Sequence, residues 1–249
     1  MKKLLLLSLV VCSASALFAQ DSTATATGKK KKKDWSKVSL ANRANDHFMI
    51  QIGYLGWATS DNTINSKGIP RTFNFYFMLD FPFKTDPRYS VGLGAGLATD
   101  NMYFKNTTID IAGLNNSTLL FKDASNAEHF KKLKLMTTYL EAPVELRFSS
   151  SPETPNKSWK FALGGKFGFL TSASVKGKTL LNATGGTIAN YTEKQKSKRF
   201  FNGSRLSATA RISYGVFGIY GAYQITSLLK DGSGPSINPF QIGISISGL

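Results

Sequence analysis

Apolar and polar side chains alternate along much of this chain with a period of two residues. The clearest stretch is 72–83, TFNFYFMLDFPF, in which every second side chain from Phe73 to Phe81 is aromatic or aliphatic and those between are mixed. This period is typical of a β-strand with one apolar and one mixed face. Seven other segments show the same pattern. The eight predicted strands are 47–57, 72–83, 89–100, 132–148, 159–175, 205–214, 217–225 and 240–247.

The segments between these strands are alternately long and short. The short ones are 84–88, 149–158 and the pair Gly215-Val216, whereas the others are long and polar. Short turns at one end and long loops at the other are typical of transmembrane barrels, whose termini lie on the short-turn, periplasmic side. The sequence therefore predicts an all-β fold, an eight-stranded antiparallel up-and-down transmembrane β-barrel, over residues 47–249.

Two strands of the prediction have irregular continuations. Leu133 and Leu135 fall out of phase with the apolar face of 132–148, which predicts a bulge or an exit from the membrane at that point. The long excursion 101–131 contains strand-like runs near 102–104 and 119–121. These runs are expected to be extensions of the barrel strands.

A soluble barrel of the lipocalin type would also have one apolar face. The residues on the second face therefore distinguish a membrane barrel from a soluble one. In 89–100 and 159–175 this face is mostly Gly, Ala and Ser. Such residues weaken a strand on a water-exposed surface but fit the crowded lumen of a small barrel. Aromatic residues at strand ends beside short turns also fit the interfacial girdle of a membrane barrel. They are Tyr89, Trp159, Tyr214 and Phe217.

Charged residues of both signs share the small-residue face. Buried charges are tolerated when they are paired, so these residues predict an ion network in the lumen. Tyr76 and Met78 should add to the filling, because the lumen of an eight-stranded barrel is only just wide enough for side chains, and we expect poor conduction. The predicted lumen charges are Asp80, Glu141, Glu145, Arg147, Lys160, Lys166, Arg205 and Arg211.

The turn 149–158 predicts one specific lumen pair. If Phe148 faces Trp159 across this turn, each step back on one strand is matched by a step forward on the other. Glu141 is then opposite Lys166, and both side chains point inward.

The N-terminus has the features of a secretory signal peptide. Lys2 and Lys3 precede an apolar run and a small-residue tail, which predicts a signal peptide over 1–19 with cleavage after Ala19. A lipoprotein interpretation of Cys12 is disfavoured because Val11 precedes it where a small residue is wanted. With Cys12 removed, the mature chain has no cysteine, which excludes disulfides and thiol catalysis.

The region 20–46 is predicted to be a flexible basic periplasmic tail, because it lacks an apolar period and contains the lysine run 29–33. It is either a solvated linker or a segment that touches anionic lipid headgroups. The whole chain carries a formal charge of +16, of which +14 remains after the signal peptide is removed. Such an excess favours anionic partners, and for an exported chain lipid phosphate is a better candidate than nucleic acid.

The polar and basic loop 176–204 is expected to be extracellular. Its charged side chains could meet the phosphates of lipopolysaccharide through charge-assisted hydrogen bonds. A protein partner could also bind the long loops or the basic tail. The residues expected to face lipopolysaccharide are Lys194, Lys196, Lys198 and Arg199.

Two short motifs resemble those of a known family. Residues 139–143 (YLEAP) and 234–243, in which Gly234-Pro235 is followed by Pro239 and Gly243, are similar to the PorT-like outer-membrane β-barrel proteins of Gram-negative bacteria. The resemblance covers about residue 47 to the C-terminus and implies an eight-stranded barrel in the outer membrane. Some members of that family serve protein secretion and gliding, and many have no assigned role. Leu249 departs from the aromatic residue that often ends such barrels.

Candidate catalytic chemistry is sparse. His47 should lie near the periplasmic rim and His129 in a long loop, with no nucleophile at useful spacing, no cluster of metal ligands and no phosphate-cradling motif. We therefore expect no cofactor and no enzyme activity. The leading hypothesis is an integral outer-membrane protein with a structural, assembly or secretion-associated, or interaction role. The alternatives are a small passive transport pore, a soluble lipocalin-like carrier, and a lipid A-modifying hydrolase with His129 as base.

Overall fold

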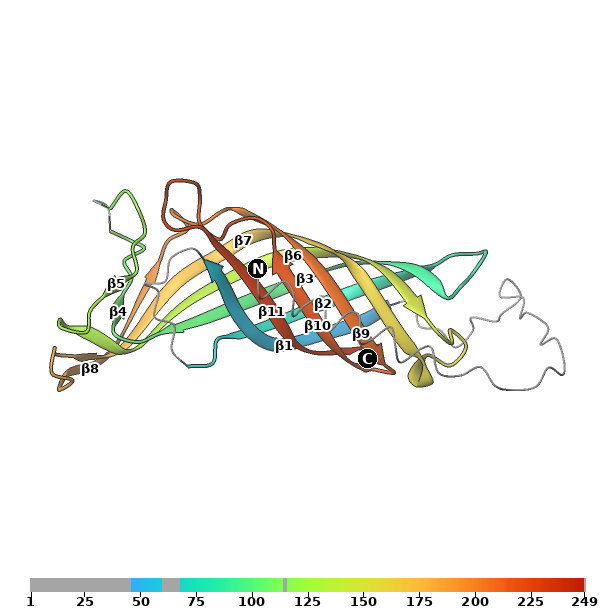
Figure 1. Ribbon diagram of the computed structural model, residues 1–249, viewed down its shortest axis with the longest axis horizontal. Coiled ribbons are helices and arrows are strands. Elements are labelled where there is room, and N and C mark those ends of the chain that lie inside the picture. Colours follow the sequence, from blue (N-terminus) through green and yellow to red (C-terminus); the bar gives the residue numbers. More distant parts are fainter. Residues whose placement is uncertain (1–45, 60–67, 114–115, 249) are drawn as a thin grey trace, which may run out of the picture. The chain divides into compact units, whose positions relative to one another are not determined.

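The computed structural model describes residues 46–59, 68–113 and 116–248 (Figure 1). The predicted signal peptide, nearly all of the predicted tail and Leu249 lie outside these residues. Within the described part, no helix is long and apolar enough to cross a membrane, and a short 3-10 helix, Pro155–Lys157, lies in a turn. The strands are β1 Asp46–Thr59, β2 Arg71–Pro82, β3 Tyr89–Phe104, β4 Thr107–Thr108, β5 Lys122–Asp123, β6 His129–Ser149, β7 Trp159–Leu181, β8 Thr187–Lys196, β9 Ser204–Tyr214, β10 Phe217–Gln224 and β11 Ile237–Ser247.

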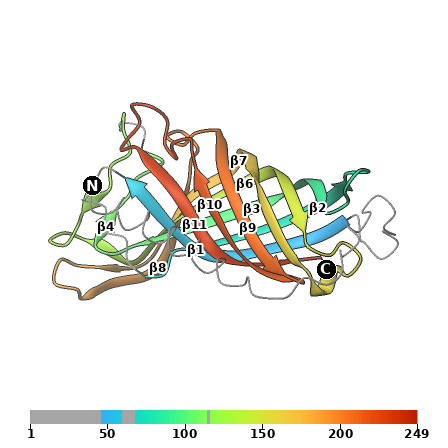
Figure 2. The ribbon, with the colours of Figure 1, turned by 45° about the vertical axis from the view of Figure 1, so that its right-hand side comes forward.

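Eight of these strands close into a ring. Their order is β1-β2-β3-β6-β7-β9-β10-β11, every neighbouring pair is antiparallel, and β6 pairs with β7 (Figures 1 and 2). The first and last strands complete the ring over a register that runs from Met49 opposite Ser247 to Thr59 opposite Ile237. The prediction of an eight-stranded antiparallel up-and-down barrel is therefore confirmed. The short turns lie at one end, here called the short-turn end, and β4, β5 and β8 lie at the other, the long-loop end.

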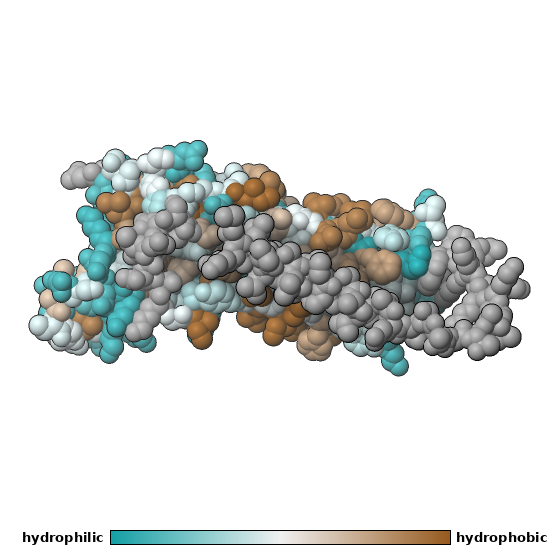
Figure 3. Space-filling view, in the orientation of Figure 1, coloured by the Kyte–Doolittle hydropathy of each residue, from teal (hydrophilic) through white to brown (hydrophobic). Residues whose placement is uncertain are grey.

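The ring has its apolar side chains outside. Along β2, buried and exposed positions alternate from Arg71 to Phe81, and the exposed ones include Phe73 and Phe77. Figure 3 shows apolar side chains over the strands and polar ones toward the long-loop end. An exterior of this kind suits lipid and would be poorly tolerated in water, so it argues against the soluble carrier.

The aromatic residues predicted for the girdle gather at the short-turn end. Trp159 and Tyr214 are opposite each other on β7 and β9, with ring centroids 5.4 Å apart, and Phe217 is opposite Tyr214 across the Gly215-Val216 turn. The ring centroids of Tyr89 and Phe148 are 5.2 Å apart. All four predicted residues are exposed on the outer surface, where amphipathic rings suit a membrane interface.

Two predictions about the strand ends are wrong and one is confirmed. β3 does extend through Phe104, as expected near 102–104. The run 119–121 is not a strand, and the short strand β5 follows it. The predicted loop 176–204 contains the end of β7 and all of β8, which pairs with it. β8 is largely exposed along its length, so it has no apolar period by which its strand could be predicted.

Of the two alternatives predicted at Leu133 and Leu135, a bulge or an exit from the membrane, the bulge lies on a different strand. β6 runs without an irregularity against β3, and Leu133 and Leu135 point inward in phase with Tyr139. They are out of phase with the outer apolar face because they fill the lumen. The bulge is on β7, where Thr138 and Tyr139 of β6 pair with Ser172 and Leu170 and leave Thr171 unpaired. This extra residue exchanges the two faces of β7 beyond it.

The predicted register of the β6–β7 hairpin is wrong by two residues. Phe148 is opposite Phe161, so Glu141 is opposite Gly168 and not opposite Lys166. A shift of two residues leaves every side chain on its own face, so the alternation that located both strands could not detect it. The length of the turn sets the register, and the strand pattern does not contain it.

Gly164 and Gly165 on β7 have different surroundings. A Cβ at Gly164 would lie against the carbonyl oxygen of Val144 and 2.8 Å from the Cα of Glu145, whereas at Gly165 its nearest neighbour, the carbonyl oxygen of Ser207, would be 3.5 Å away. We expect Gly164→Ala to lower the free energy of unfolding by about 1–3 kcal/mol because backbone has to move. Gly165→Ala should change it by less than about 0.5 kcal/mol. Urea unfolding in phosphatidylcholine vesicles measures both, and equal losses would contradict the close approach of β6 and β7 at Gly164.

Candidate functional site

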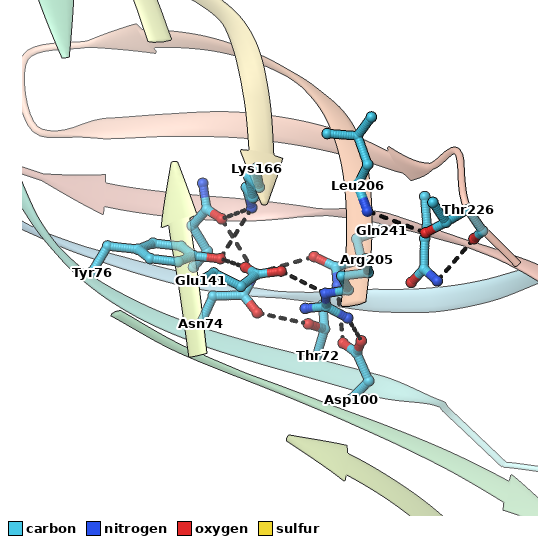
Figure 4. Close-up of polar contacts among 12 residues, drawn as sticks. Thr72, Asn74, Tyr76, Asp100, Glu141, Lys166, Arg205, Leu206, Thr226 and Gln241 are labelled. Atoms are coloured by element: carbon cyan, nitrogen blue, oxygen red, sulfur yellow. Dashed lines mark hydrogen bonds and ion pairs between the residues drawn. The ribbon is translucent and has the colours of Figure 1, made fainter. Parts of the chain in front are cut away.

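The centre of the lumen contains a buried ion cluster. Arg205 on β9 donates from Nε to Oε1 of Glu141 at 2.5 Å and from Nη1 to Oδ2 of Asp100 at 2.6 Å (Figure 4). Its guanidinium lies 3.8 Å from the ring centroid of Tyr139. The hydroxyl of Tyr76 donates to the other oxygen of Glu141. One arginine therefore joins carboxylates from β3 and β6 across the barrel.

Lys166 is buried beside this cluster, and within the part of the chain that the structure describes it forms no direct ion pair with a carboxylate. Its Nζ donates to Oε1 of Gln51 at 3.0 Å and to the hydroxyl of Tyr76 at 3.3 Å, and it lies 5.0 Å from the Tyr76 ring centroid (Figure 4). Glu141 and Lys166, predicted as a cross-strand pair, are thus connected through Tyr76. Asn74 and Gln241 extend the network to Asp100, with Nε2 of Gln241 donating to its Oδ1 at 2.9 Å.

A second ion cluster lies toward the short-turn end. Glu145 accepts from Arg211 at 2.8 Å and from Arg147 at 2.9 Å, and Arg147 also contacts Asp80 at 3.4 Å. At the rim of this end, Nζ of Lys160 donates to the carbonyl oxygen of Gly215 at 3.0 Å.

The predicted lumen charges therefore divide into two clusters and a rim lysine. Asp100 was missed because it stands at the end of a predicted strand. The small residues of the predicted strand 89–100 have even numbers, and Asp100 has one too. This shared face would have identified Asp100 as a lumen residue.

The long-loop end of the lumen is closed by a hydrophobic cluster, here called the cap. Inward residues of the strands, such as Leu133 and Leu135 of β6, meet side chains from the long excursion, such as Ile111 and Leu119. The segments around Phe200 and Leu229 complete it. The long polar loops were expected to be contact surfaces only, and this buried apolar contribution was not predicted. Its full membership is Leu55, Met102, Phe104, Ile109, Ile111, Leu119, Phe121, Leu133, Leu135, Tyr139, Leu170, Ala173, Val175, Phe200, Phe201, Leu228, Leu229 and Ile237.

Little space remains along the barrel axis. Two cavities beside the central cluster, lined by Lys166 and Arg205 in one case and by Leu55 and Asp100 in the other, have volumes of about 10 Å³ each. Larger hollows lie at the ends. One of about 240 Å³ opens beside Arg147 at the short-turn end, and one of about 410 Å³ lies under the long excursion. Among the described residues, the two cavities beside the central cluster are therefore each too small for a solute.

The residues considered for catalysis have structural surroundings. His129 begins β6 and is buried, with its Nδ1 2.9 Å from the carbonyl oxygen of Ala127. That contact orients the ring and offers no nucleophile to activate. His47 lies in β1, and its side chain is outside the described set. Among the described residues, no group of three or more His, Cys, Asp or Glu is arranged to hold a metal ion.

The four basic residues expected to face lipopolysaccharide occupy two kinds of site. Lys194 and Lys196 are exposed on β8. Lys198 donates to the carbonyl oxygen of Leu170 at 3.5 Å, and Arg199 donates from Nη1 to that of Gly113 at 3.2 Å. All four side chains are exposed, but Lys194 and Lys196 lie on a strand whereas Lys198 and Arg199 contact backbone between strands.

Several known proteins are similar to this chain. Among solved structures, the chain is similar to Ail, the attachment invasion locus protein of Yersinia pestis, solved with the heparin analogue sucrose octasulfate, at 13% identity and a TM-score of 0.34, covering 82% of this chain and 100% of that one. It is similar to Neisserial surface protein A at 9% identity and a TM-score of 0.35, covering 82% and 96%.

The N-terminal β-barrel domain of Pseudomonas aeruginosa OprF matches at 8% identity and a TM-score of 0.29, covering 83% of this chain and 99% of that domain. The search of curated proteins gave no match. The family described as outer membrane protein β-barrel domain matches residues 38–230, most of the chain. With a closed ring that turns its apolar side chains outward, the chain belongs to this family and is an integral protein of the Gram-negative outer membrane.

Proposed function

We propose that this protein is a PorT-like, non-enzymatic component of the outer membrane with a structural, assembly or secretion-associated, or interaction role. The observation that carries the proposal is the filling of the lumen. The two ion clusters occupy its centre and short-turn half, and the cap closes the other end. A barrel of this kind can anchor loops in a membrane but has no open path for a solute.

The long-loop end is the part suited to interaction. β6 and β7 are the longest strands and continue past the bulge, where β8 adds to them. Loops and edges carried by a rigid scaffold are common sites of binding. The motifs at 139–143 and 234–243 support the PorT-like assignment, and with it a partner in the cell envelope.

The proposal is tested by conductance. Refolded protein that shows heat-modifiable mobility on a gel, and is therefore folded, should produce no stable channel steps in planar lipid bilayers, because side chains fill the lumen. A porin that is refolded and added to the same planar bilayers is the positive control. Stable steps of porin size would contradict the closed barrel and favour the passive pore.

A further inference from the structure

Six lysines form one continuous surface on the sheet of β6, β7 and β8, here called the lysine face. In the strand register, Lys134, Lys176 and Lys194 are directly opposite one another across the three strands. Lys132 and Lys178 are opposite each other in the next row, and Lys196 follows two residues after Lys194. Five of the six are exposed and Lys134 is half-buried. The lysine face consists of Lys132, Lys134, Lys176, Lys178, Lys194 and Lys196.

The bulge on β7 creates this surface. Before Thr171 in the sequence, the odd-numbered Phe167 and Phe169 point outward. After Thr171, the even-numbered Lys176 and Lys178 point outward. Without the extra residue, Lys176 and Lys178 would point toward the cap and Val175 would be on the outside. A single unpaired residue therefore brings the lysines of β7 into line with those of β6 and β8.

The lysine face continues the lipid-facing surface of the barrel. On β6, Leu140 is 52% exposed on the outer face, and Lys134 is six positions further along the same face, about 20 Å at the usual rise per residue. The opposite face of the sheet carries Leu133, Leu135 and Val175, which are buried in the cap. Charged side chains on a lipid-facing strand belong beyond the hydrocarbon, at headgroup level.

The arrangement is unfavourable for the protein alone. Side chains directly opposite each other on antiparallel strands have Cβ atoms about 4.5–5.5 Å apart, and like charges at such positions destabilise a sheet. Among the described residues, no carboxylate forms an ion pair with any of the six lysines. The acidic residue of β8, Glu193, points to the other face and accepts from Gln195 at 3.0 Å. A bound polyanion would remove this repulsion.

We propose that the lysine face binds the phosphorylated headgroup of a glycolipid in the membrane leaflet at the long-loop end. This inference rests on the proposed function only in requiring that the barrel is inserted in the membrane. Lipid is preferred to a soluble polyanion because the face adjoins the surface that contacts acyl chains. Several phosphates on one headgroup would match rows of ammonium groups that a single monovalent anion could not span.

The test measures the binding of lipid A to the protein in neutral detergent micelles, and native mass spectrometry detects the bound lipid. Changing the central row, Lys134→Gln, Lys176→Gln and Lys194→Gln together, should weaken lipid A binding by at least about tenfold, because three of the six cations that would meet its phosphates are removed. Dephosphorylated lipid A should bind weakly to both proteins. Without lipid, the triple variant should resist urea at least as well as the wild type, because like charges have been removed.

The matched control removes the same charge elsewhere. Lys105, Lys122 and Lys230 are exposed at the long-loop end and lie outside the lysine face, so changing them to Gln should leave lipid A binding near the wild-type level. An equal loss in this control, equal binding of dephosphorylated lipid A, or complete displacement of lipid A by an equal concentration of inorganic phosphate would overturn the proposal. Failure of the wild type to insert into lipid would instead contradict the proposed function, and heat-modifiable mobility detects it separately.

Discussion

Replacing Arg205 by Met is expected to lower the free energy of unfolding by about 3–5 kcal/mol, the usual cost of removing one partner from a buried ion cluster. The arginine bonds Glu141 and Asp100 while only 4% of its side chain is exposed. Methionine fills much of the same volume but leaves two carboxylates in the lumen without their cation. Urea unfolding in phosphatidylcholine vesicles, followed by tryptophan fluorescence, measures the loss.

The chain offers a matched control for this experiment. Arg88 and Asp86 form a pair at 2.6 Å, the distance between Arg205 and Asp100, but in a turn, with 31% and 26% of their side chains exposed. Arg88→Met should cost far less than Arg205→Met, because solvent screens an exposed ion pair. The double change Arg205→Met and Asp100→Asn should recover a large part of the loss, because the remaining buried charges, Glu141 and Lys166, then balance each other. Similar losses for Arg205→Met and Arg88→Met would show that the central cluster does not stabilise the barrel through burial.

The cap is expected to depend on single apolar side chains of the long excursion. Leu119→Ala should weaken the docking of this excursion by about 2–5 kcal/mol, because it removes a fully buried side chain from a packed cluster. The backbone N–H of Leu119 also donates to the carbonyl oxygen of Ser233 at 2.7 Å, so the excursion and the last loop should loosen together. Faster trypsin cleavage after Lys105 and Lys122 in the folded protein measures this opening.

Leu120, the neighbour of Leu119 in the sequence, provides the control. Leu120 is 52% exposed, so Leu120→Ala should leave the rate of cleavage near that of the wild type. Both variants should keep heat-modifiable mobility, because the strands of the ring are unchanged. If Leu119→Ala and Leu120→Ala are cleaved equally fast, the excursion is not held by its buried leucine and the cap is not a packed core.

Period-two alternation predicted the eight ring strands and the face of the charges within them that were considered for the lumen. It could do so because a strand in a membrane barrel separates lipid from lumen at every residue, as β2 shows from Arg71 to Phe81. It could not predict which charges meet. The partners of Arg205 come from β3 and β6, across the barrel, and their distances depend on registers that a shift of two residues leaves invisible in the pattern.

The features missed by the sequence analysis have a common physical origin. β8 and the cap lie beyond the membrane, where lipid no longer requires one apolar face per strand. Lys176 was assigned to a loop for this reason, although the spacing of two residues between Lys176 and Lys178, and again between Lys194 and Lys196, is that of a strand. The bulge at Thr171 has no distinctive residue that would have revealed it.

The pairing of β1 with β11 sets an order on assembly. Before these strands meet, both are open edges, and their union joins residues that are almost two hundred positions apart in the chain. A contact across that seam, such as Asn74 to Gln241, can form only after the C-terminal strand has arrived. Until then the carboxylates and cations of the lumen face water and are fully hydrated. An interior from which charges have been removed should lose its water more readily during closure. We therefore expect the residues that hold the finished barrel together to slow its last step.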